Sequence, residues 1–211
     1  MTLKYLKEVD STQTYIKEYI KNNAEINDVC FYTYNQTAGL GSQNNKWEGK
    51  NGNLFFSFSI LLEKLPSDLP LQSSSIYFSY ILKELLQNFG SNIILKWPND
   101  FYIDKNKIGG LITNKTNKRL ICGIGLNLNK TSSFDGKLDI DINKELLLKE
   151  YFKKLEDYVS WKQIFSKYKL EFHHNKLFYT NINNIKISLE NAILNDDGSL
   201  NINNKKVYSL R

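Results

Sequence analysis

The sequence is poor in several residues that mark particular protein classes. Only two of its 211 residues are cysteine, and Cys30 and Cys122 both lie in apolar segments, so buried free thiols are favoured over a disulfide scaffold. No apolar run approaches the roughly 20 residues of a membrane helix. Residues 1–7 alternate like a strand and lack a signal-peptide pattern. These absences predict a cytoplasmic protein with no membrane partner.

The sequence also lacks a convincing set of residues for nucleophilic catalysis. Its only histidines are His173 and His174, which lie in a predicted late helix and are expected to be structural or exposed. Neither a Ser-His-Asp nor a Cys-His set emerges from the pattern. A mechanism without a protein nucleophile is therefore favoured.

Apolar and aromatic residues are present in sufficient number for one ordered core. Hydrophobic residues make up 41% of the chain, with 13 Tyr and 12 Phe among them, which excludes a disordered chain. The formal charge of +6 favours a solvated lysine-rich surface, with an anionic nucleotide or an acidic carrier domain as the alternative explanation. No basic run is interleaved with aromatic residues, so nucleic acid is disfavoured as a partner.

Periodicity and turn residues predict a succession of strands and helices. Strands are expected at residues 3–9, 28–34 and 54–62 and in short segments between residues 93 and 127. Helices are expected at residues 11–22, with Asp10 as the N-cap, at residues 71–89, ended by Gly90, and in two segments after residue 143. Short strands with a tight turn at residues 195–198 follow. We therefore predict a larger domain over residues 1–175 and a small β module over residues 176–211.

A glycine-containing loop is the first segment that suggests chemistry. Gly39 and Gly41 lie between Gln36 and Lys46-Trp47. Paired glycines let backbone N–H groups approach a ligand, especially a phosphate. Taken alone, this segment is better explained as an ordinary glycine-rich turn.

The second segment is the pentapeptide Lys96-Trp97-Pro98-Asn99-Asp100. Trp97 and Pro98 are expected to anchor and stiffen a turn. Asn99 and Asp100 are then neighbouring oxygen donors suited to Mg²⁺ and phosphate. A capped turn between two strands is the alternative, but the unusual pattern favours a function.

Glycines inside predicted strands are the third feature. Lys107 opens a strand with Gly109 and Gly110 in its interior, and glycine weakens a strand unless something must come close to the backbone. A flat ligand on the sheet explains this pair, and a β-bulge with an exposed lysine is the alternative. A fourth, weaker segment begins with small residues at 123–125, and its Asn127 either reads a base edge or caps the strand end.

These segments, in this order and spacing, resemble the biotin–protein ligases over nearly the whole chain. Ser11 and Thr12 match the family's Ser-Thr biotin-contact segment, and residues 36–47 match the position of its glycine-rich loop. The lysine-tryptophan-proline-asparagine-aspartate element is the most specific part of the match. The resemblance implies an α+β fold related to class II aminoacyl-tRNA synthetases. It consists of a mixed β-sheet flanked by helices, which is the catalytic domain, and a small C-terminal SH3-like β-barrel.

The resemblance also implies a reaction in two steps, with ATP and Mg²⁺ as cofactors and biotin as substrate. Biotin and ATP form biotinyl-5′-AMP and pyrophosphate, and a lysine of a biotin carboxyl carrier protein then displaces AMP. Lys107 is the implied catalytic residue, and Asn99 and Asp100 are implied to hold Mg²⁺. The implied biotin-binding residues are Ser11, Thr12, Gln36, Gly39, Leu40, Gly41, Gly109 and Gly110. The implied ATP-binding residues are Ser42, Lys46, Trp47, Lys96, Asn99, Asp100, Asn127 and Phe134, the last as an adenine-stacking aromatic.

The glycine loop departs from the family pattern. Where the family usually has several arginines, this sequence has Leu40, Ser42, Gln43, Asn44 and Asn45, and only Lys46 keeps a charge. Each charged hydrogen bond contributes about 1.5–3 kcal/mol. We therefore expect a weaker hold on the adenylate.

Two rival functions and several properties stay open at this point. A lipoate or octanoate ligase shares the implied fold but usually has an arginine-rich glycine run with a histidine, which this chain lacks. A non-catalytic biotin-binding sensor is disfavoured by the retained Lys107 and Asp100. The first strand starts too early for an N-terminal helix-turn-helix, so DNA binding by that route is not expected. A monomer and a homodimer are both compatible with the sequence.

Overall fold

The computed structural model describes residues 1–23, 27–41, 45–49, 51–129, 136–182 and 185–208. Its centre is a seven-stranded mixed sheet with the strand order β1-β2-β5-β9-β8-β7-β6. The strands are β1 (Thr2–Tyr5), β2 (Val29–Thr33), β5 (Leu54–Leu61), β9 (Arg119–Leu126), β8 (Asn106–Thr116), β7 (Asp100–Ile103) and β6 (Ile94–Lys96). β1 and β2 pair in parallel, and every other pair in this sheet is antiparallel.

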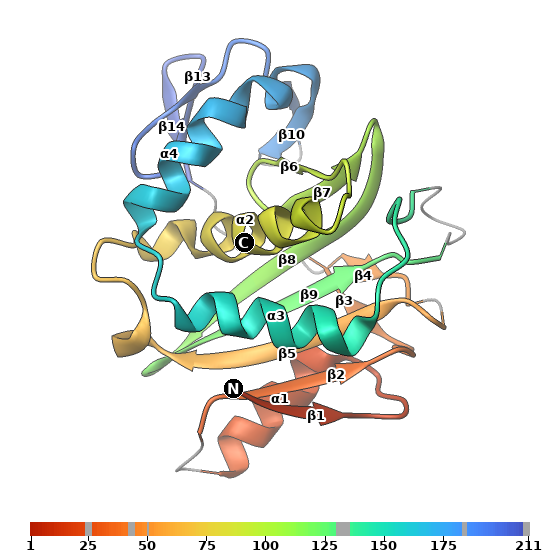
Figure 1. The fold of residues 1–211 in the computed structure, drawn as a ribbon. Helices are drawn as coiled ribbons and strands as arrows, with labels where there is room; N and C mark the ends of the chain where they lie inside the picture. The colour runs from red at the N-terminus through yellow and green to blue at the C-terminus, as the bar shows by residue number, and fades with distance from the viewer. Residues whose placement is uncertain (24–26, 42–44, 50, 130–135, 183–184, 209–211) are drawn as a thin grey trace.

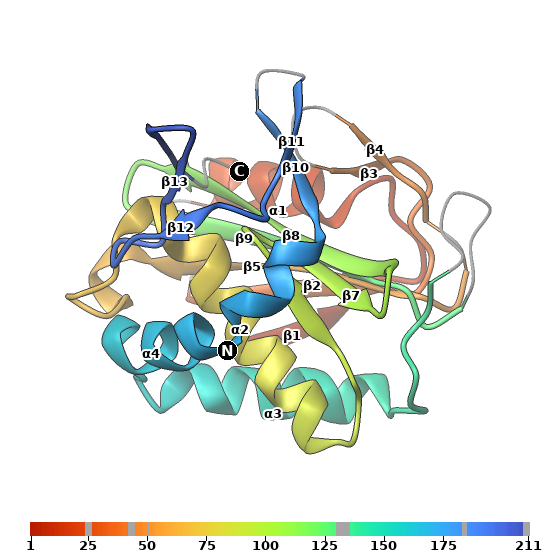
Figure 2. The same ribbon diagram turned by 90° about the horizontal axis from the view of Figure 1, so that it is seen from above.

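Helices cover both faces of this sheet (Figures 1 and 2). α1 (Thr12–Asn22) lies against one face, and α2 (Ser74–Asn88) and α3 (Lys144–Glu156) lie against the other, with α4 (Trp161–Glu171) beside α2. Among the described residues, short 3-10 helices connect these elements at Leu62–Lys64, Leu71–Ser73 and Phe172–Leu177. The expected mixed sheet with flanking helices is confirmed.

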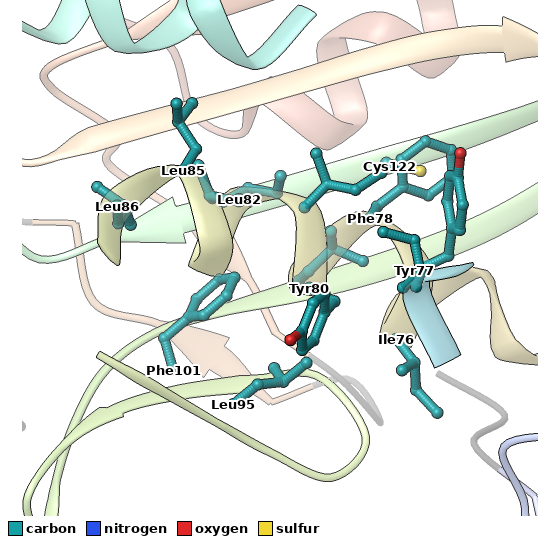
Figure 3. Close-up of a cluster of buried hydrophobic side chains, with 14 of the residues drawn as sticks. Ile76, Tyr77, Phe78, Tyr80, Leu82, Leu85, Leu86, Leu95, Phe101 and Cys122 are labelled. Atoms are coloured by element: carbon teal, nitrogen blue, oxygen red, sulfur yellow. The ribbon is translucent and has the colours of Figure 1, made fainter. Parts of the chain in front are cut away.

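The main hydrophobic core lies between the sheet and the helices α2 and α3. Phe56 and Phe58 of β5 are fully buried there, and their rings contact Tyr151 and Phe152 of α3. Figure 3 shows the buried side chains of α2 together with Leu95, Phe101 and Cys122 of the strands. Burial of these large apolar side chains is the main favourable term in folding.

The capping and turn residues show why the elements begin and end where they do. Ser11, not Asp10 as expected, is the N-cap of α1: its side chain accepts a hydrogen bond from the Thr14 N–H, while Asp10 Oδ1 accepts from the Ser11 N–H. Ser160 and Gln163 form a capping box at the start of α4. Gly90, with a φ of 97°, ends α2 as expected, since glycine adopts this left-handed conformation without strain.

The C-terminal segment forms two small antiparallel sheets. One contains β10 (Tyr179–Ile182) and β11 (Ile185–Ser188), and the other contains β12 (Ile193–Leu194), β13 (Leu200–Ile202) and β14 (Lys205–Val207). The second sheet shares the main core through Leu194, Leu200 and Ile202, and the Trp97 Nε1–H donates to the Gly198 carbonyl at 2.9 Å. The β content of this region is confirmed, and the boundary at residue 175 stays a prediction.

The cysteines are buried and the histidines are exposed, as expected from the sequence. Cys30 and Cys122 are free and buried, and burial raises the pKa of both thiols well above their usual range. His173 and His174 are exposed in the 3-10 helix at the end of α4. Within the described part of the chain, no helix combines the length and the apolar character required to cross a membrane.

Candidate active site

The three segments that suggested chemistry meet at one cavity of about 390 Å³ on the α1 face of the sheet. This volume is in the range of small-molecule sites. Eleven residues predicted for the site line it: Ser11, Thr12, Gln36, Leu40, Gly41, Lys46, Trp47, Asn99, Asp100, Lys107 and Gly110. Residues from the start of α1, the glycine loop and the strands β7 and β8 thus share one space, although they are far apart in the sequence.

The floor of the cavity is made by small residues in neighbouring strands. Ser57 of β5 pairs with Gly123 of β9, which pairs with Ile112 of β8. Gly125 pairs with Gly110 in the same way. Because side chains alternate along a strand, these residues share one face. The small size of Ser57 and the three glycines leaves room for a ligand against the backbone.

Buried hydroxyl and amide groups gather at the α1 end of the cavity. The Thr12 N–H and hydroxyl both donate to Gln36 Oε1, at 3.0 and 3.3 Å, and Thr12 Oγ1 lies 2.9 Å from Ser57 Oγ. Ser11, Thr12 and Gln36 are each at most 5% exposed. Such a rigid polar cluster suits the recognition of a polar ring that is withdrawn from water.

Charged groups gather at the other end. Lys107 Nζ lies 2.7 Å from Asp100 Oδ1, and Lys96 Nζ lies 3.5 Å from Asp100 Oδ2. The Lys107 side chain is 25% exposed and faces the cavity. A second lysine near the carboxylate leaves this end with a surplus of positive charge, which favours an anionic ligand.

The turn 96–100 is held rigidly beneath this charged end. The Trp97–Pro98 peptide bond is cis, the Trp97 side chain is buried, and the Trp97 N–H donates to Asn175 Oδ1 at 2.6 Å. The Asn99 side-chain amide donates to the Leu111 carbonyl. Asn99 Oδ1 is buried without a hydrogen-bond partner among the described residues.

The glycine loop forms a short hairpin that closes one side of the cavity. Its strands are β3 (Gly39–Leu40) and β4 (Lys46–Trp47), and the Gly41 N–H donates to the Asn45 carbonyl at 2.7 Å. The Trp47 indole lies on Gly125, where an added Cβ would come within 2.8–3.2 Å of the ring. The Lys107 ammonium is 5.4 Å from the centre of the same ring. In this structure, therefore, Gly125 accommodates an aromatic side chain.

Four predicted site residues lie outside the cavity lining, which differs from the expectation. Gly109 faces the opposite side of β8, where an added Cβ would press on Phe101 and Leu126. Gly39 packs against Gln36 and the Trp47 carbonyl, so its small size serves the hairpin. Lys96 does not line the cavity, but its ammonium lies 3.5 Å from Asp100, which does. Asn127 is fully buried at the end of β9.

Asn127 belongs to a cluster of amides at this strand end. Asn53 Oδ1 accepts hydrogen bonds from the N–H groups of Leu128 and Asn129, at 2.9 and 2.7 Å, and Asn53 Nδ2 donates to Asn127 Oδ1 at 3.4 Å. Asn127 Nδ2 is buried without a partner among the described residues. The two remaining predicted residues, Ser42 and Phe134, lie outside the part of the chain that the structure describes.

The geometry differs from the expectation of a protein-held Mg²⁺ at Asn99 and Asp100. Asp100 is the only carboxylate among the described lining residues, and its two oxygens already face the ammonium groups of Lys107 and Lys96. No group of three or more His, Cys, Asp or Glu side chains suited to a metal occurs in the described residues. This donor set does not fit a resident metal ion.

The cavity also has lining residues that the sequence pattern did not single out for the site. They are Gln13, Asn45, Ser57, Leu111, Ile112, Gly123, Ile124 and Gly125. Gly123 and Gly125 carry a signal in the sequence, because two glycines alternate in an apolar strand. Ser57 carries none, because it reaches the site only after β5 and α1 are packed together. Gln13 carries only its place next to the Ser11-Thr12 segment.

The seven-stranded mixed sheet with a glycine-floored cavity on one face defines a fold of the biotin ligase type. Residues 5–129 match the model of the "Biotin/lipoate A/B protein ligase family". The chain is similar to a solved structure of the biotin acetyl coenzyme A carboxylase synthetase from Helicobacter pylori with bound biotinylated ATP. The two are 36% identical and superpose with a TM-score of 0.93, and the match covers 98% of this chain and 99% of that chain. The chain therefore belongs to the biotin/lipoate A/B protein ligase family.

Two further comparisons agree with this assignment. The biotin protein ligase from Aquifex aeolicus in complex with biotin and ATP has a TM-score of 0.75 and is 23% identical, with 100% of this chain and 96% of that chain covered; this likeness concerns the fold alone. The bifunctional ligase/repressor BirA of Escherichia coli is 30% identical over 127 residues, which are 57% of this chain. The chain spans 38% of that protein's length.

Proposed function

We propose that this chain is an ATP-dependent biotin–protein ligase that makes biotinyl-5′-AMP and transfers biotin to a lysine of a carrier protein. The observation that carries the proposal is the shared cavity of Lys107, the 96–100 turn and the glycine hairpin. Its polar end and its cationic end match the two ends of biotin. The likeness over 98% of this chain to a structure with bound biotinylated ATP supports the same function.

Biotin lies with its ureido ring at the buried polar end in this proposal. Ser11, Thr12 and Gln36 supply the hydrogen-bonding groups there. The apolar part of the ligand lies on the glycine floor beside Trp47, and the carboxylate points to Lys107. The ligand is thereby placed by groups at both ends, which lowers the entropic cost of bringing it to ATP.

The first step joins the biotin carboxylate to the α-phosphate. A carboxylate oxygen forms a bond to the α-phosphorus, the bond from that phosphorus to the β-phosphate oxygen breaks, and pyrophosphate leaves with the electron pair. Negative charge accumulates on oxygens between the two groups, where the Lys107 ammonium is positioned. Asp100 holds that ammonium at 2.7 Å before the anions arrive.

The second step transfers biotin to the carrier. The neutral amine of a carrier lysine attacks the carbonyl carbon of the mixed anhydride, the bond from this carbon to the phosphate oxygen breaks, and AMP leaves as the stable anion. The amine loses one proton to solvent. No side chain of this protein becomes covalently attached, in agreement with the absence of a nucleophilic triad in the sequence.

Mg²⁺ enters the proposal as part of the substrate MgATP and not as a metal held by Asn99 and Asp100. Mg²⁺ is commonly bound through substrate phosphates with few protein ligands. Asn99 Oδ1, buried and without a partner among the described residues, is placed to accept a hydrogen bond from the nucleotide. Asp100 serves to hold Lys107. The carrier is a biotin carboxyl carrier protein domain in this proposal.

The experiment follows both half-reactions with the purified protein. MgATP is supplied with biotin, lipoate or octanoate, and pyrophosphate release is measured for each acid. Labelled biotin is then followed onto a purified carrier domain. We expect pyrophosphate release with biotin and transfer of the label. Release driven only by lipoate or octanoate would make this a ligase for those acids, and biotin binding with neither half-reaction would make it a non-catalytic sensor.

Lys107 is tested in the same assay. Lys107→Gln should lower the rate of biotinyl-5′-AMP formation about 10²- to 10³-fold, the usual effect of removing one group that stabilises transition-state charge. Lys105→Gln, in the exposed turn before the same strand, is the matched control and should keep the rate. Equal rates for both variants would remove Lys107 from the mechanism.

A further inference from the structure

Gln13 is a buried amide of the cavity to which neither the sequence analysis nor the proposed mechanism assigns a role. It lies in the first turn of α1, is 3% exposed and lines the cavity next to Thr12. Its Oε1 sits over Gly123, where an added Cβ would overlap the oxygen. The side chain therefore occupies the polar end, above the glycine floor.

The orientation of this amide is set by a neighbour outside the cavity. Gln13 Nε2 donates to Asn114 Oδ1 of β8 at 2.9 Å. With the nitrogen directed to Asn114, the oxygen faces Gly123 and the cavity. With Asn114 in its present orientation, a reversed Gln13 amide would bring two oxygens together and lose this hydrogen bond.

Gln13 Oε1 has no donor among the residues that the structure describes. The nearby hydroxyls of Thr12 and Ser57 are paired with each other, and Thr12 also donates to Gln36. A buried acceptor without a partner is unfavourable by about 1–3 kcal/mol, and native proteins rarely keep one without a reason. A ligand with an N–H group at this position would satisfy it.

We propose that Gln13 determines acid specificity by accepting a hydrogen bond from one N–H of the biotin ureido ring. This inference rests on the proposed function. A ureido ring has two N–H donors, whereas the dithiolane of lipoate and the alkyl chain of octanoate have none. A site built around a buried acceptor rejects such acids because the acceptor then stays unpaired. Gln13 thus separates the proposed activity from its nearest rivals.

The test is a double-mutant cycle between the side chain and the ligand, measured by isothermal titration calorimetry. The ligands are biotin and two cyclic carbamate analogues, in each of which one ureido N–H is replaced by oxygen. Wild-type protein should bind one of the two carbamates about tenfold or more weakly than biotin, since the new ring oxygen faces Gln13 Oε1. Gln13→Met should bind biotin about tenfold more weakly and should no longer distinguish it from that carbamate.

Two further variants serve as a control and as an independent test for the double-mutant cycle. Glu18→Met, at an exposed position of α1, should bind all three ligands like wild type. Asn114→Ala changes an exposed residue and frees the Gln13 amide to rotate, so it should reduce the same discrimination even if Gln13→Met fails to fold.

The outcomes separate this inference from the proposed function. If Gln13→Met and Asn114→Ala weaken biotin and both carbamates by the same factor, or leave the discrimination intact, Gln13 only shapes the cavity and the inference is wrong. If wild-type protein does not bind biotin at all, the proposed function fails and the inference fails with it. Loss of discrimination in the variants, with biotin binding retained by wild type, supports both.

Discussion

Around the cavity, the two faces of the seven-stranded sheet differ in chemistry although they are made by the same strands. On the face under α2 and α3, β5 presents Phe56 and Phe58 to a core of aromatic rings. On the face under α1, the same strand presents Ser57, beside Gly123 of β9. Ser57 and Phe58 are both fully buried, so exposure does not distinguish the faces.

The difference teaches that burial has two purposes in this protein. Large side chains on one face fill space and stabilise the fold. Small and polar side chains on the other face leave space and keep hydrogen-bonding groups in fixed positions for a ligand. Substitutions on the first face should change stability, and substitutions of the cavity residues on the second should change binding.

The largest expected effect is on the core face. Phe58→Ala removes a fully buried ring that contacts Phe78 and Phe152 at centroid distances of 5.3 and 5.2 Å. It should lower the free energy of unfolding by about 3–5 kcal/mol. Ser57→Ala, one residue earlier, should cost about 1 kcal/mol and weaken biotin. Urea unfolding measures the stability of each variant, and biotin titration measures its affinity. Equal losses of stability in Phe58→Ala and Ser57→Ala would contradict the division between the faces.

A second substitution fills the binding face. In Gly125→Val the new side chain would displace the Trp47 indole, which lies within 2.8–3.2 Å of the position of a Cβ. Overpacking of this size is unfavourable by about 1–3 kcal/mol, and we expect it to appear as weaker biotin binding. Gly90→Ala is the control: it has open space but a φ of 97°, so it should lower stability and leave the biotin Kd unchanged. A normal Kd for Gly125→Val would show that Trp47 does not take part in binding.

A third substitution tests the strand end between the two faces. Asn53→Asp keeps the acceptor for the N–H groups of Leu128 and Asn129 but loses the donor to Asn127. If Asn127 reads adenine, its amide loses a fixed orientation, and the ATP KM should rise about threefold to tenfold while the biotin Kd and the midpoint of unfolding change little. The exposed Asn51, changed to Asp, controls for the added charge. An ATP KM equal to that of the control would limit Asn53 to a structural role.

The smallest expected effect concerns a carboxylate on neither face. Burial tends to raise the pKa of Asp139, but hydrogen bonds from Ser91 and from the backbone and side chain of Asn92 outweigh it and lower this pKa below its usual value. A lowered folded-state pKa stabilises the protein above the unfolded value near about 3.9, and this stabilisation is lost as the pH falls through the folded pKa. Asp139→Asn should therefore lower stability at neutral pH by at most about 1 kcal/mol, with a smaller difference below about pH 4. Unfolding curves at both pH values measure this difference, and a constant gap would contradict it.

Much of the site could be predicted from the sequence because its chemistry is local. Lys107, the turn residues Asn99 and Asp100, and the hairpin glycine Gly41 stand in short segments with unusual composition, and all of them line the cavity. The neighbours Gly109 and Gly110 show the limit of such prediction. Both are glycines in one strand, but only Gly110 faces the cavity, and Gly109 faces Phe101.

The residues that were missed depend on pairing between distant segments. Gly123 and Ser57 meet because β5 and β9 are paired in one register, and a shift by one residue would reverse the faces. Gln13 reaches the same place because α1 packs over these strands. The sequence pattern also did not show that Lys96 and Lys107, which come from different strands, both lie against Asp100. Their two ammonium groups disfavour the predicted binding of a metal ion by this carboxylate.

The sequence by itself determined where most strands, helices and turns lie, because periodicity, capping and the glycine conformations are properties of a few neighbouring residues. It also determined the family, through short segments of unusual composition. The tertiary structure alone decided which face of each strand lines the cavity and that Asp100 holds two lysines. It also decided that Gln13 brings an unpaired oxygen to the cavity. These features arise from long-range register and helix packing, which no local pattern encodes.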